Sequence, residues 1–283
     1  MSVNPNTVSF HDGRAAPQLG VGVWQIEDEA TPSVIESALQ IGYRSIDTAA
    51  IYGNEAGVGR GIAQSGVPRE ELFIATKLWN DRHGHDSTRT AFLESLDRLA
   101  LDYVDLYLIH WPVPMAGMFV DAWETMIQLR DEGLARSIGV CNFNIDHLQT
   151  LLDKTGVMPV VNQIELHPLF QQAELRDFHA EHDIITEAWS PLGRGRVWDD
   201  PTLTAIAEKH GRSLAQVMIR WHTQLGNMVI PKSVNPKRLE ENFRIFDFDL
   251  DDDDMAQIAR LDRADGRYGP DPDVFRQLPA RAT

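Results

Sequence analysis

Four residues whose side chains can move or polarise a proton stand where three successive apolar segments end. Asp47, Lys77 and His110 each follow one of these segments directly, and Tyr52 comes five residues after Asp47. Neighbouring parallel strands lie about 4.8 Å apart, so residues that follow the ends of such strands at the same edge of the sheet lie close together. Each residue alone has an ordinary structural explanation, such as a buried ion pair or a packed histidine. Because all four occur together, we expect them to form a single site.

The chemistry that this set supports is proton transfer to an oxygen atom. A free tyrosine has a pKa of about 10 and is a weak acid at neutral pH. We expect the ammonium of Lys77 to lower the pKa of Tyr52, and Asp47 to keep that ammonium charged and in place. We expect His110 to donate a hydrogen bond to a substrate oxygen. Such a set is suited to protonating a carbonyl oxygen while hydride reaches the carbonyl carbon.

A second cluster gathers positive charge in a chain that is otherwise acidic. The chain carries 26 Lys+Arg against 42 Asp+Glu, which gives a formal net charge of −16. Three basic residues nevertheless fall between Lys232 and Arg238, after the seventh apolar segment. Barrels of parallel strands commonly bind phosphate after their last strands, at the start of a short helix. We expect Lys232 and Arg238 to straddle a phosphate and Ser233 to add its hydroxyl; an ordinary solvated helix start is the alternative.

The elements that must position these residues are short apolar segments alternating with helical patterns. Near-continuous apolar runs are typical of parallel strands that are covered on both faces. Between them, apolar residues recur at helical spacing, as in Val34, Ile35, Ala38 and Leu39 after Pro32. We expect eight strands, at residues 43–46, 72–76, 104–109, 137–141, 160–165, 184–189, 228–230 and 243–246.

This alternation predicts an α/β fold, a (β/α)8 TIM barrel, with residues 1–283 forming one domain. The other possibility is an open doubly wound sheet, which often carries a G-x-G-x-x-G turn between a strand and a helix. The glycines at residues 20–22 and 57–61 do not have that spacing and context. In a barrel, the C-terminal ends of the strands form the active-site mouth, and the tetrad of Asp47, Tyr52, Lys77 and His110 is expected there.

Both ends of the chain are expected to cover the barrel. Residues 7–10 and 19–24 flank the turn signal His11-Asp12-Gly13, which predicts an N-terminal β-hairpin plugging the bottom of the barrel. The C-terminal tail, residues 267–283, holds three of the 15 prolines and is expected to form a loop over the active site. The acidic run at residues 249–254 is expected to begin a helix, where negative charge is favourable.

Composition excludes several classes of protein. An apolar share of 43% is ample for a folded core. The acidic balance disfavours binding to nucleic acid or to an anionic membrane. The one cysteine, Cys141, permits no intrachain disulfide and is expected to be a buried small hydrophobe rather than a redox-sensitive thiol. The first ten residues show no secretory signal and no apolar stretch reaches about 18 residues, so we expect a cytoplasmic protein.

The tetrad, together with residues 230–242, resembles the aldo-keto reductases, and in particular their bacterial 2,5-diketo-D-gluconate reductase-like members. The resemblance spans roughly residues 8–268 and rests on motifs in order: Gly22-Val23-Trp24, Asp47-Thr48-Ala49 with Tyr52-Gly53-Asn54-Glu55, Lys77-Leu78-Trp79, His110-Trp111-Pro112 and Ile230-Pro231-Lys232-Ser233. It implies a barrel enzyme that uses NADPH to reduce aldehydes or ketones, such as α-dicarbonyls and keto-sugars, to alcohols. It also implies that Tyr52 is the general acid, that Lys77 and Asp47 tune it, and that His110 orients the carbonyl.

The resemblance further implies where the coenzyme lies. The implied contacts are Cys141, Asn142, Gln163, Trp189, Ser190, Leu192, Lys232, Ser233, Val234, Arg238, Glu241 and Asn242. The first three would hold the nicotinamide carboxamide, Trp189 would stack on the ring, the basic residues would take the 2′-phosphate, and the last two would contact the adenine. The chain departs from the family pattern at Cys141, where serine is usual, and at Trp189, where tyrosine is common. Because a thiol is a weaker hydrogen-bond partner, we expect Asn142 and Gln163 to make more of the carboxamide contact.

The substrate pocket is expected to be aromatic. Trp24, Trp79 and Trp111 lie at or near predicted strand ends and are expected to line it, although each alone could equally belong to the core. Specificity in such barrels is set by long loops, here residues 81–86, 113–119 and 193–200 together with the tail. The physiological substrate does not follow from the sequence, and we expect a monomer.

Three other functions stay open at the level of the sequence. Glu165 and Glu187, at the ends of successive predicted strands, could form the carboxylate pair of a glycosidase, but that leaves Tyr52, Lys77 and the basic residues 232–238 without a role. A metallohydrolase would need converging ligands, whereas His83 and His85 are expected to be exposed in a loop, and we predict no metal site. The chain could also be a catalytically weak NADPH-binding redox sensor or a module that docks on a partner.

Overall fold

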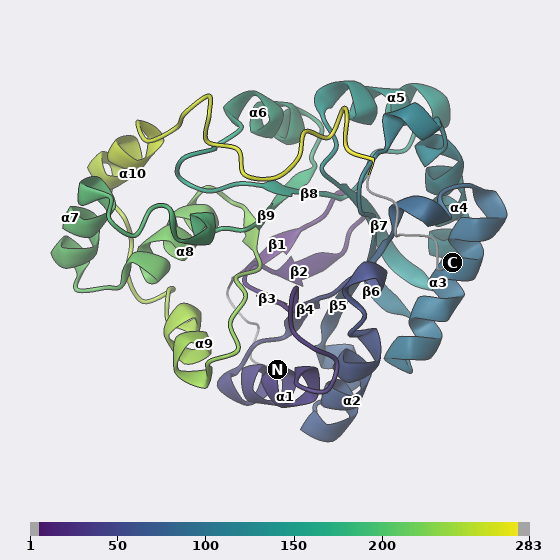
Figure 1. Cartoon of the computed structure of the whole chain (residues 1–283), viewed down its shortest axis with the longest axis horizontal. Helices are drawn as coiled ribbons and strands as arrows, with labels where there is room; N and C mark the ends of the chain where they lie inside the picture. Colours follow the sequence, from purple (N-terminus) through teal and green to yellow (C-terminus); the bar gives the residue numbers. More distant parts are fainter. Residues whose placement is uncertain (1–5, 277–283) are drawn as a thin grey trace.

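The centre of the protein is a closed sheet of parallel strands. The structure, a computed structural model, describes residues 6–276. Eight strands follow one another around the sheet in chain order. They are β3 (Val21–Gly22), β4 (Ser45–Asp47), β5 (Phe73–Leu78), β6 (Val104–Ile109), β7 (Ala135–Cys141), β8 (Val161–Glu165), β9 (Ile185–Trp189) and β10 (Met228–Val229). A parallel bridge between Leu19 and Val229 joins the two edges of the sheet, which closes it into a barrel (Figure 1). The predicted (β/α)8 barrel is confirmed.

Helices surround the barrel on its outer face (Figure 1). Within residues 6–276 they are α1 (Thr31–Ile41), α2 (Glu55–Ser65), α3 (His85–Leu99), α4 (Phe119–Asp131), α5 (Ile145–Thr155), α6 (Ala173–Glu181), α7 (Pro201–His210), α8 (Leu214–Gln224), α9 (Pro236–Phe243) and α10 (Asp252–Ala259). The longer helices turn an apolar stripe inward; α4, for example, buries Trp123, Met126 and Leu129 at helical spacing. This cover explains why most strands read as near-continuous apolar runs. None of the helices described is both long enough and apolar enough to cross a membrane.

A small N-terminal hairpin closes the bottom of the barrel. β1 (Thr7–Ser9) pairs antiparallel with β2 (Ala15–Pro17), and Gly13 in the turn has a φ of +85°, which glycine adopts without strain. Phe10 and Ala16 are buried in an apolar cluster with residues of β5, β6, β8 and β10. The predicted plug is therefore confirmed.

The second arm of the hairpin is not the segment that the sequence predicted. The prediction that residues 19–24 form this arm is wrong, because Val21–Gly22 is β3 and pairs in parallel with β4. The short turn at Asp12-Gly13 returns the chain by Ala15, so the next apolar segment is free to join the barrel. The barrel therefore begins one strand earlier than predicted.

The predicted strand at residues 243–246 is also wrong. Asn235 caps α9 through its side chain, and the helix continues to Phe243. Leu239 and Phe243 stand four residues apart, which places them on one face of the helix. A short apolar run is ambiguous between strand and helix, and here it ends a helix. β10 is consequently the last strand of the barrel, and the basic residues 232–238 follow the eighth strand rather than the seventh.

The C-terminal tail crosses the mouth of the barrel. Asp251 caps α10 through its side chain, so the acidic run begins a helix as predicted. Beyond α10 the chain runs past the ends of β8 and β7 toward α5 (yellow in Figure 1). The predicted loop over the active site is confirmed for residues 267–276, and residues 277–283 lie outside the part of the chain that the structure describes.

Candidate active site

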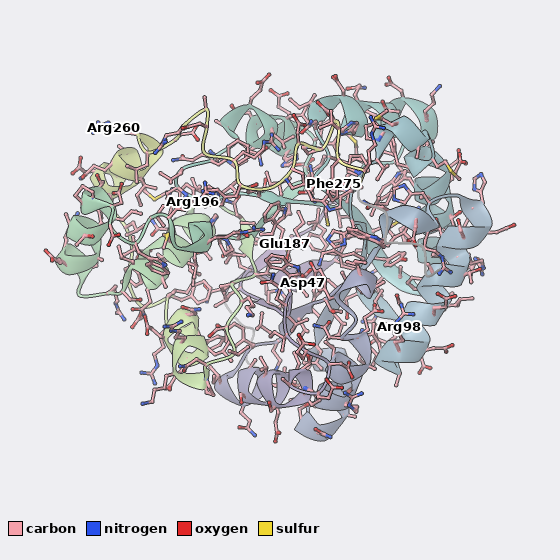
Figure 2. The ribbon with its side chains drawn as sticks, in the orientation of Figure 1. Asp47, Arg98, Glu187, Arg196, Arg260 and Phe275 are labelled. Atoms are coloured by element: carbon pink, nitrogen blue, oxygen red, sulfur yellow. The ribbon has the colours of Figure 1, made fainter. Side chains whose placement is uncertain are left out.

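A cavity of about 550 Å³ opens at the C-terminal ends of the strands. Its walls include three tetrad residues and the three predicted pocket tryptophans: Asp47, Tyr52, His110, Trp24, Trp79 and Trp111. The fourth tetrad residue, Lys77, is wholly buried beside Asp47. Figure 2 labels Asp47 near the middle of the barrel. The structure thus brings the four residues together, as strands β4, β5 and β6 are neighbours in the sheet.

The ammonium of Lys77 is held by three acceptors. Its Nζ donates to Asp47 Oδ1 at 2.7 Å, to Asp47 Oδ2 at 2.6 Å and to the carbonyl of Thr48 at 2.7 Å. An ammonium has three hydrogens, so every donor has a partner. The same Nζ lies 5.2 Å from the centre of the Tyr52 ring. The positive charge is therefore fixed in one place beneath the phenol.

Burial and charge act in opposite directions on these groups. Burial raises the pKa of Tyr52 above its usual value, and the positive charge of Lys77 offsets only part of that rise. Lys77 lowers the pKa of Tyr52 as predicted, but the pKa still lies above its usual value, because the phenol loses more solvation than the ammonium restores. Burial disfavours the charged form of Lys77, but the negative charge of Asp47 and its hydrogen bond, together with the neighbouring acidic groups Tyr52 and Cys141, outweigh burial and raise the pKa of the lysine. At neutral pH the phenol is protonated and the lysine is charged.

His110 is a neutral donor candidate beside the phenol. Burial and the charge of Lys77 hold the pKa of His110 well below its usual value, so the imidazole is uncharged at neutral pH. Its ring meets the Tyr52 ring edge-on, with centroids 5.7 Å apart, and packs edge-on against Trp79 at 5.0 Å. Its Nδ1 is buried and has no hydrogen-bond partner among residues 6–276. A buried polar atom without a partner is costly, which is common where a ligand completes the site.

A second buried carboxylate, which the tetrad prediction did not include, stands behind Asp47. Gln163 Nε2 donates to Asp47 Oδ1 at 2.9 Å and to Glu187 Oε2 at 2.8 Å. Burial, together with the negative charge of Asp47, raises the pKa of Glu187 to about 7. Figure 2 labels Asp47 and Glu187 close together at the centre of the barrel. The amide of Gln163 thus links the tetrad to a group that titrates near neutral pH.

Several of the residues implied as coenzyme contacts lie on the same cavity. Asn142, Gln163, Trp189, Ser190 and Lys232 all line it. Trp189 Nε1 donates to Asn142 Oδ1 at 2.8 Å, and Asn142 Nδ2 donates to the carbonyl of His110 at 3.0 Å. Asn142 and Ser190 have φ angles of +61° and +50°, a backbone conformation that residues other than glycine seldom adopt. Such conformations concentrate at functional sites.

Other implied contacts lie away from this cavity. Cys141 is wholly buried in the apolar cluster inside the barrel, and burial raises the pKa of its thiol well above the usual value. The thiol is therefore a packed group and not a reactive one. Leu192 packs partly buried against the outer core. Near α9, Ser233 and Asn242 are buried, whereas Val234, Arg238 and Glu241 are exposed.

The basic residues near α9 form an exposed group of cations. Lys232, Lys237 and Arg238 are all exposed, and within residues 6–276 none of them takes part in an ion pair. Arg244, just past the end of the same helix, is by contrast paired with Glu240. Ser233 Oγ accepts from the backbone N–H of Asn235 at 3.1 Å and so shapes the turn that leads into the helix. Cations without partners at a helix start are suited to an anionic ligand.

Five residues that the sequence did not single out also line the cavity. They are Gln25, Ile51, Arg194, Pro270 and Phe275. Phe275 comes from the tail and packs on Trp111 with ring centroids 4.3 Å apart; Figure 2 labels it above the barrel strands. Arg194 Cζ lies 5.0 Å from the Trp24 ring. The prolines of the tail indicated a loop, but nothing in the sequence indicated which aromatic residue it carries to the mouth.

The residues that other functions would require are placed elsewhere. Neither Glu165 nor Glu187 lines the 550 Å³ cavity. The prediction that His83 is exposed is wrong: it is buried, and burial lowers its pKa to about 4. His85 is exposed at the start of α3 and faces Asp121 and Glu124 on α4, outside the cavity. The carbonyl-reduction set is the one that the structure gathers around a common space.

Comparison with known proteins gives consistent matches over most of the chain. A sequence model of the aldo/keto reductase family matches residues 16–263. An aldo-keto reductase from Mycobacterium sp. (strain JLS) is 56% identical over 95% of this chain and 97% of its own. The methylglyoxal reductase DkgA of Escherichia coli (strain K12) is 55% identical over 96% of this chain and 98% of its own. The crystal structure of a mutant of Gox0644 in complex with NADPH superposes with a TM-score of 0.93 at 52% identity, covering 96% of this chain and 99% of that one.

Proposed function

Because this chain belongs to the aldo/keto reductase family, we propose that it reduces the carbonyl group of aldehydes and ketones to alcohols with NADPH. The observation that carries this proposal is the buried Lys77–Asp47 pair beneath Tyr52, in a cavity that also holds His110. A phenol poised over a fixed ammonium and next to a neutral imidazole is a proton donor for an oxygen that gains negative charge.

The residues around the cavity fit this coenzyme. Trp189 lies on the cavity wall, and the second amide hydrogen of Asn142 and the carbonyl oxygen of Gln163 offer hydrogen bonds suited to a carboxamide. Lys232 on the cavity wall and the exposed Arg238 offer positive charge without ion-pair partners in residues 6–276, as a 2′-phosphate requires. When bound there, NADPH supplies the hydride that reaches the carbonyl carbon.

The protein groups manage the proton and the charge. Tyr52 gives its proton to the carbonyl oxygen, and the ammonium of Lys77 stabilises the phenolate that remains. Asp47 holds Lys77 charged and immobile through both of its carboxylate oxygens. His110, neutral at neutral pH, donates to the substrate oxygen and orients the carbonyl. The tryptophans of the wall exclude water from the developing charge, which strengthens these interactions.

The substrate class that we propose is a small carbonyl compound with little charge. Relatives are named as methylglyoxal reductases, and the walls of the cavity are largely aromatic: Trp24, Trp79, Trp111, Trp189 and Phe275. An α-dicarbonyl such as methylglyoxal presents an electrophilic carbonyl and an apolar methyl group, which suits such walls. A cytoplasmic location, a monomeric state and a single domain stay predictions from the sequence.

The test is loss of NADPH absorbance with methylglyoxal and a panel of aldehydes and keto-sugars. We expect turnover with the α-dicarbonyls, and one alcohol formed for each NADPH consumed. Tight NADPH binding without turnover of any carbonyl would instead favour the redox-sensor or docking role. Release of an aryl alcohol from an aryl glycoside without coenzyme would favour the carboxylates Glu165 and Glu187.

A further inference from the structure

Glu165 binds the C-terminal tail with both of its carboxylate oxygens. It ends β8, and it is 3% exposed. Its Oε1 accepts from the backbone N–H of Tyr268 at 2.6 Å, and its Oε2 accepts from the backbone N–H of Gly269 at 2.7 Å. His167 Nε2 lies 3.0 Å from the same Oε1. We call this set of contacts to residues 268–269 the tail clamp.

The ring of Tyr268 is held on both sides of the clamp. It stacks on the His167 ring with centroids 4.3 Å apart and an interplanar angle of 12°. The guanidinium carbon of Arg196 lies 4.0 Å from the centre of the Tyr268 ring. Tyr268 is therefore fixed through both its backbone and its side chain, and Gly269 through its backbone.

Gly269 brings the tail against the edge of Trp189. A Cβ atom at this position would lie 2.6 Å from Trp189 Cη2 and 2.9 Å from Glu165 Oε2. Both distances are too short for any side chain, so glycine is required for the clamp to close. The same tryptophan forms a wall of the active-site cavity.

Beyond the clamp the tail supplies part of that cavity. Pro270 and Phe275 line it, and Phe275 packs on Trp111. Asn144 Nδ2 donates to Asp273 Oδ1 at 2.7 Å, which ties this part of the tail to the start of α5. The tail is thus anchored on the barrel before Pro270 and again before Phe275.

We propose that Glu165 is a positioning residue for substrate binding: it clamps residues 268–269 so that Phe275 stands as a fixed wall of the cavity. This inference rests on the proposed carbonyl reductase function and adds a residue that sets which substrates fit. A carboxylate suits the task because it has two acceptors and no hydrogen, and hydrogen bonds to a charged group are stronger than neutral ones.

The ionisation of Glu165 agrees with this role. Burial alone would raise the pKa of Glu165, but the hydrogen bonds from His167, Gly269 and Tyr268 lower it below its usual value. The clamp is therefore charged throughout the neutral range. Both oxygens of Glu165 face the tail, and the carboxylate does not line the active-site cavity, so it is not placed to act as the acid or base of a glycosidase there.

The main test compares Glu165→Gln with the wild type on a small and a large carbonyl substrate, methylglyoxal and 4-nitrobenzaldehyde. The glutamine side chain has the same size as glutamate, but its NH2 group would face one of the two backbone N–H groups that Glu165 accepts from, and two donors cannot form a hydrogen bond. We expect KM for the aromatic aldehyde to rise about tenfold, kcat to stay within about twofold, and KM for methylglyoxal to change little. Glu181→Gln, at an exposed position on α6, removes the same charge and should change nothing.

Two further variants separate the clamp from a general loss of structure. Gly269→Ala opens the clamp from the tail side while the carboxylate of Glu165 itself is kept. In both Glu165→Gln and Gly269→Ala, trypsin should cleave faster after Arg267, which reports tail release without any turnover. In a Phe275→Ala background, Glu165→Gln should add no further rise in KM, because the wall that it positions is gone.

Unchanged KM and unchanged cleavage in both clamp variants would overturn the proposal. A fall in kcat with KM unchanged would do the same, since it would place Glu165 in the chemical step. Failure of the wild type to turn over either carbonyl would overturn the proposed function instead. Faster cleavage in the variants would, even then, support the clamp.

Discussion

The interior of the barrel and the rim around its mouth hold their functional residues in opposite ways. At the inner wall of the cavity and behind it, Asp47, Lys77, Gln163 and Glu187 are buried and joined by hydrogen bonds of 2.6 to 2.9 Å. At the rim near α9, the basic residues are exposed, and within residues 6–276 no ion pair engages them. The interior is complete before any ligand arrives, whereas the rim presents charges that a ligand must satisfy. Substitutions in the two regions should therefore have different effects. In the interior they should change the turnover rate and the stability of the protein, and at the rim they should change the affinity for the coenzyme.

The largest effect is expected for Tyr52→Phe, which removes the proton donor above the buried cluster. Turnover should fall by about 10²–10⁴-fold, the usual contribution of a positioned acid. The NADPH dissociation constant should change little, because the ring remains. Steady-state kinetics and a coenzyme titration by fluorescence measure the two quantities. Tyr103→Phe is the control, as Tyr103 lies outside the cavity; turnover of Tyr52→Phe close to that control would contradict the assignment.

The next effect concerns stability and comes from Glu187. Its pKa is about 7 in the folded protein against an ordinary 4.5, so between these values the folded state holds a proton that the unfolded state has released. Stability should therefore fall as pH rises through this window. Glu187→Gln stays neutral and should remove that loss, with a difference from wild type of up to about 3 kcal/mol above pH 7.

Urea unfolding of both proteins at pH 4.5, 6 and 7.5 measures this difference. Glu181→Gln, exposed on α6, is the control for removing one carboxylate and should follow the wild type at each pH. A constant offset between Glu187→Gln and the wild type across the three pH values would mean that Glu187 does not titrate in this window.

The smallest effect is expected at the rim, for Arg238→Ala. The exposed guanidinium is proposed to contact the 2′-phosphate, which NADPH carries and NADH lacks. Its loss should weaken NADPH binding by about 10-fold and leave NADH binding unchanged. Arg244→Ala, which removes a cation paired with Glu240 beyond the same helix, is the matched control. Equal weakening for both coenzymes would place the phosphate elsewhere.

The same contrast explains what the sequence could and could not predict. The site residues Asp47, Lys77 and His110 could be predicted from the sequence, because apolar runs indicate strands and neighbouring parallel strands bring their ends together. β3 has two residues, Val21 and Gly22, too few to leave an apolar run of its own, so it was assigned to the hairpin. The run at residues 243–246 has a strand-like composition, but its first residue, Phe243, is the last residue of α9, a helix that Asn235 caps.

Properties that depend on tertiary packing could not be predicted. The direction of the pKa shift of Tyr52 depends on how deeply the phenol is buried, and spacing along the chain does not measure that. The place of Phe275 in the cavity depends on where Glu165 holds the tail, roughly a hundred residues away in sequence. The backbone path of loops and tails depends on contacts with residues distant in sequence, and for this reason the rim was less predictable than the interior.

The number of paired positions between neighbouring strands differs around the barrel, and it is small where β10 meets the segment before β3. β6 and β7 pair over five positions, whereas one bridge, Leu19 to Val229, marks the joint between the two edges. Thermal opening of the barrel should begin at this joint, where the register between neighbouring strands is shortest. Gly22 and Ile230, which flank it, also form the cavity wall. Warming should therefore abolish catalysis before it melts the interior, so that the enzyme is inactivated while most of its barrel is still intact.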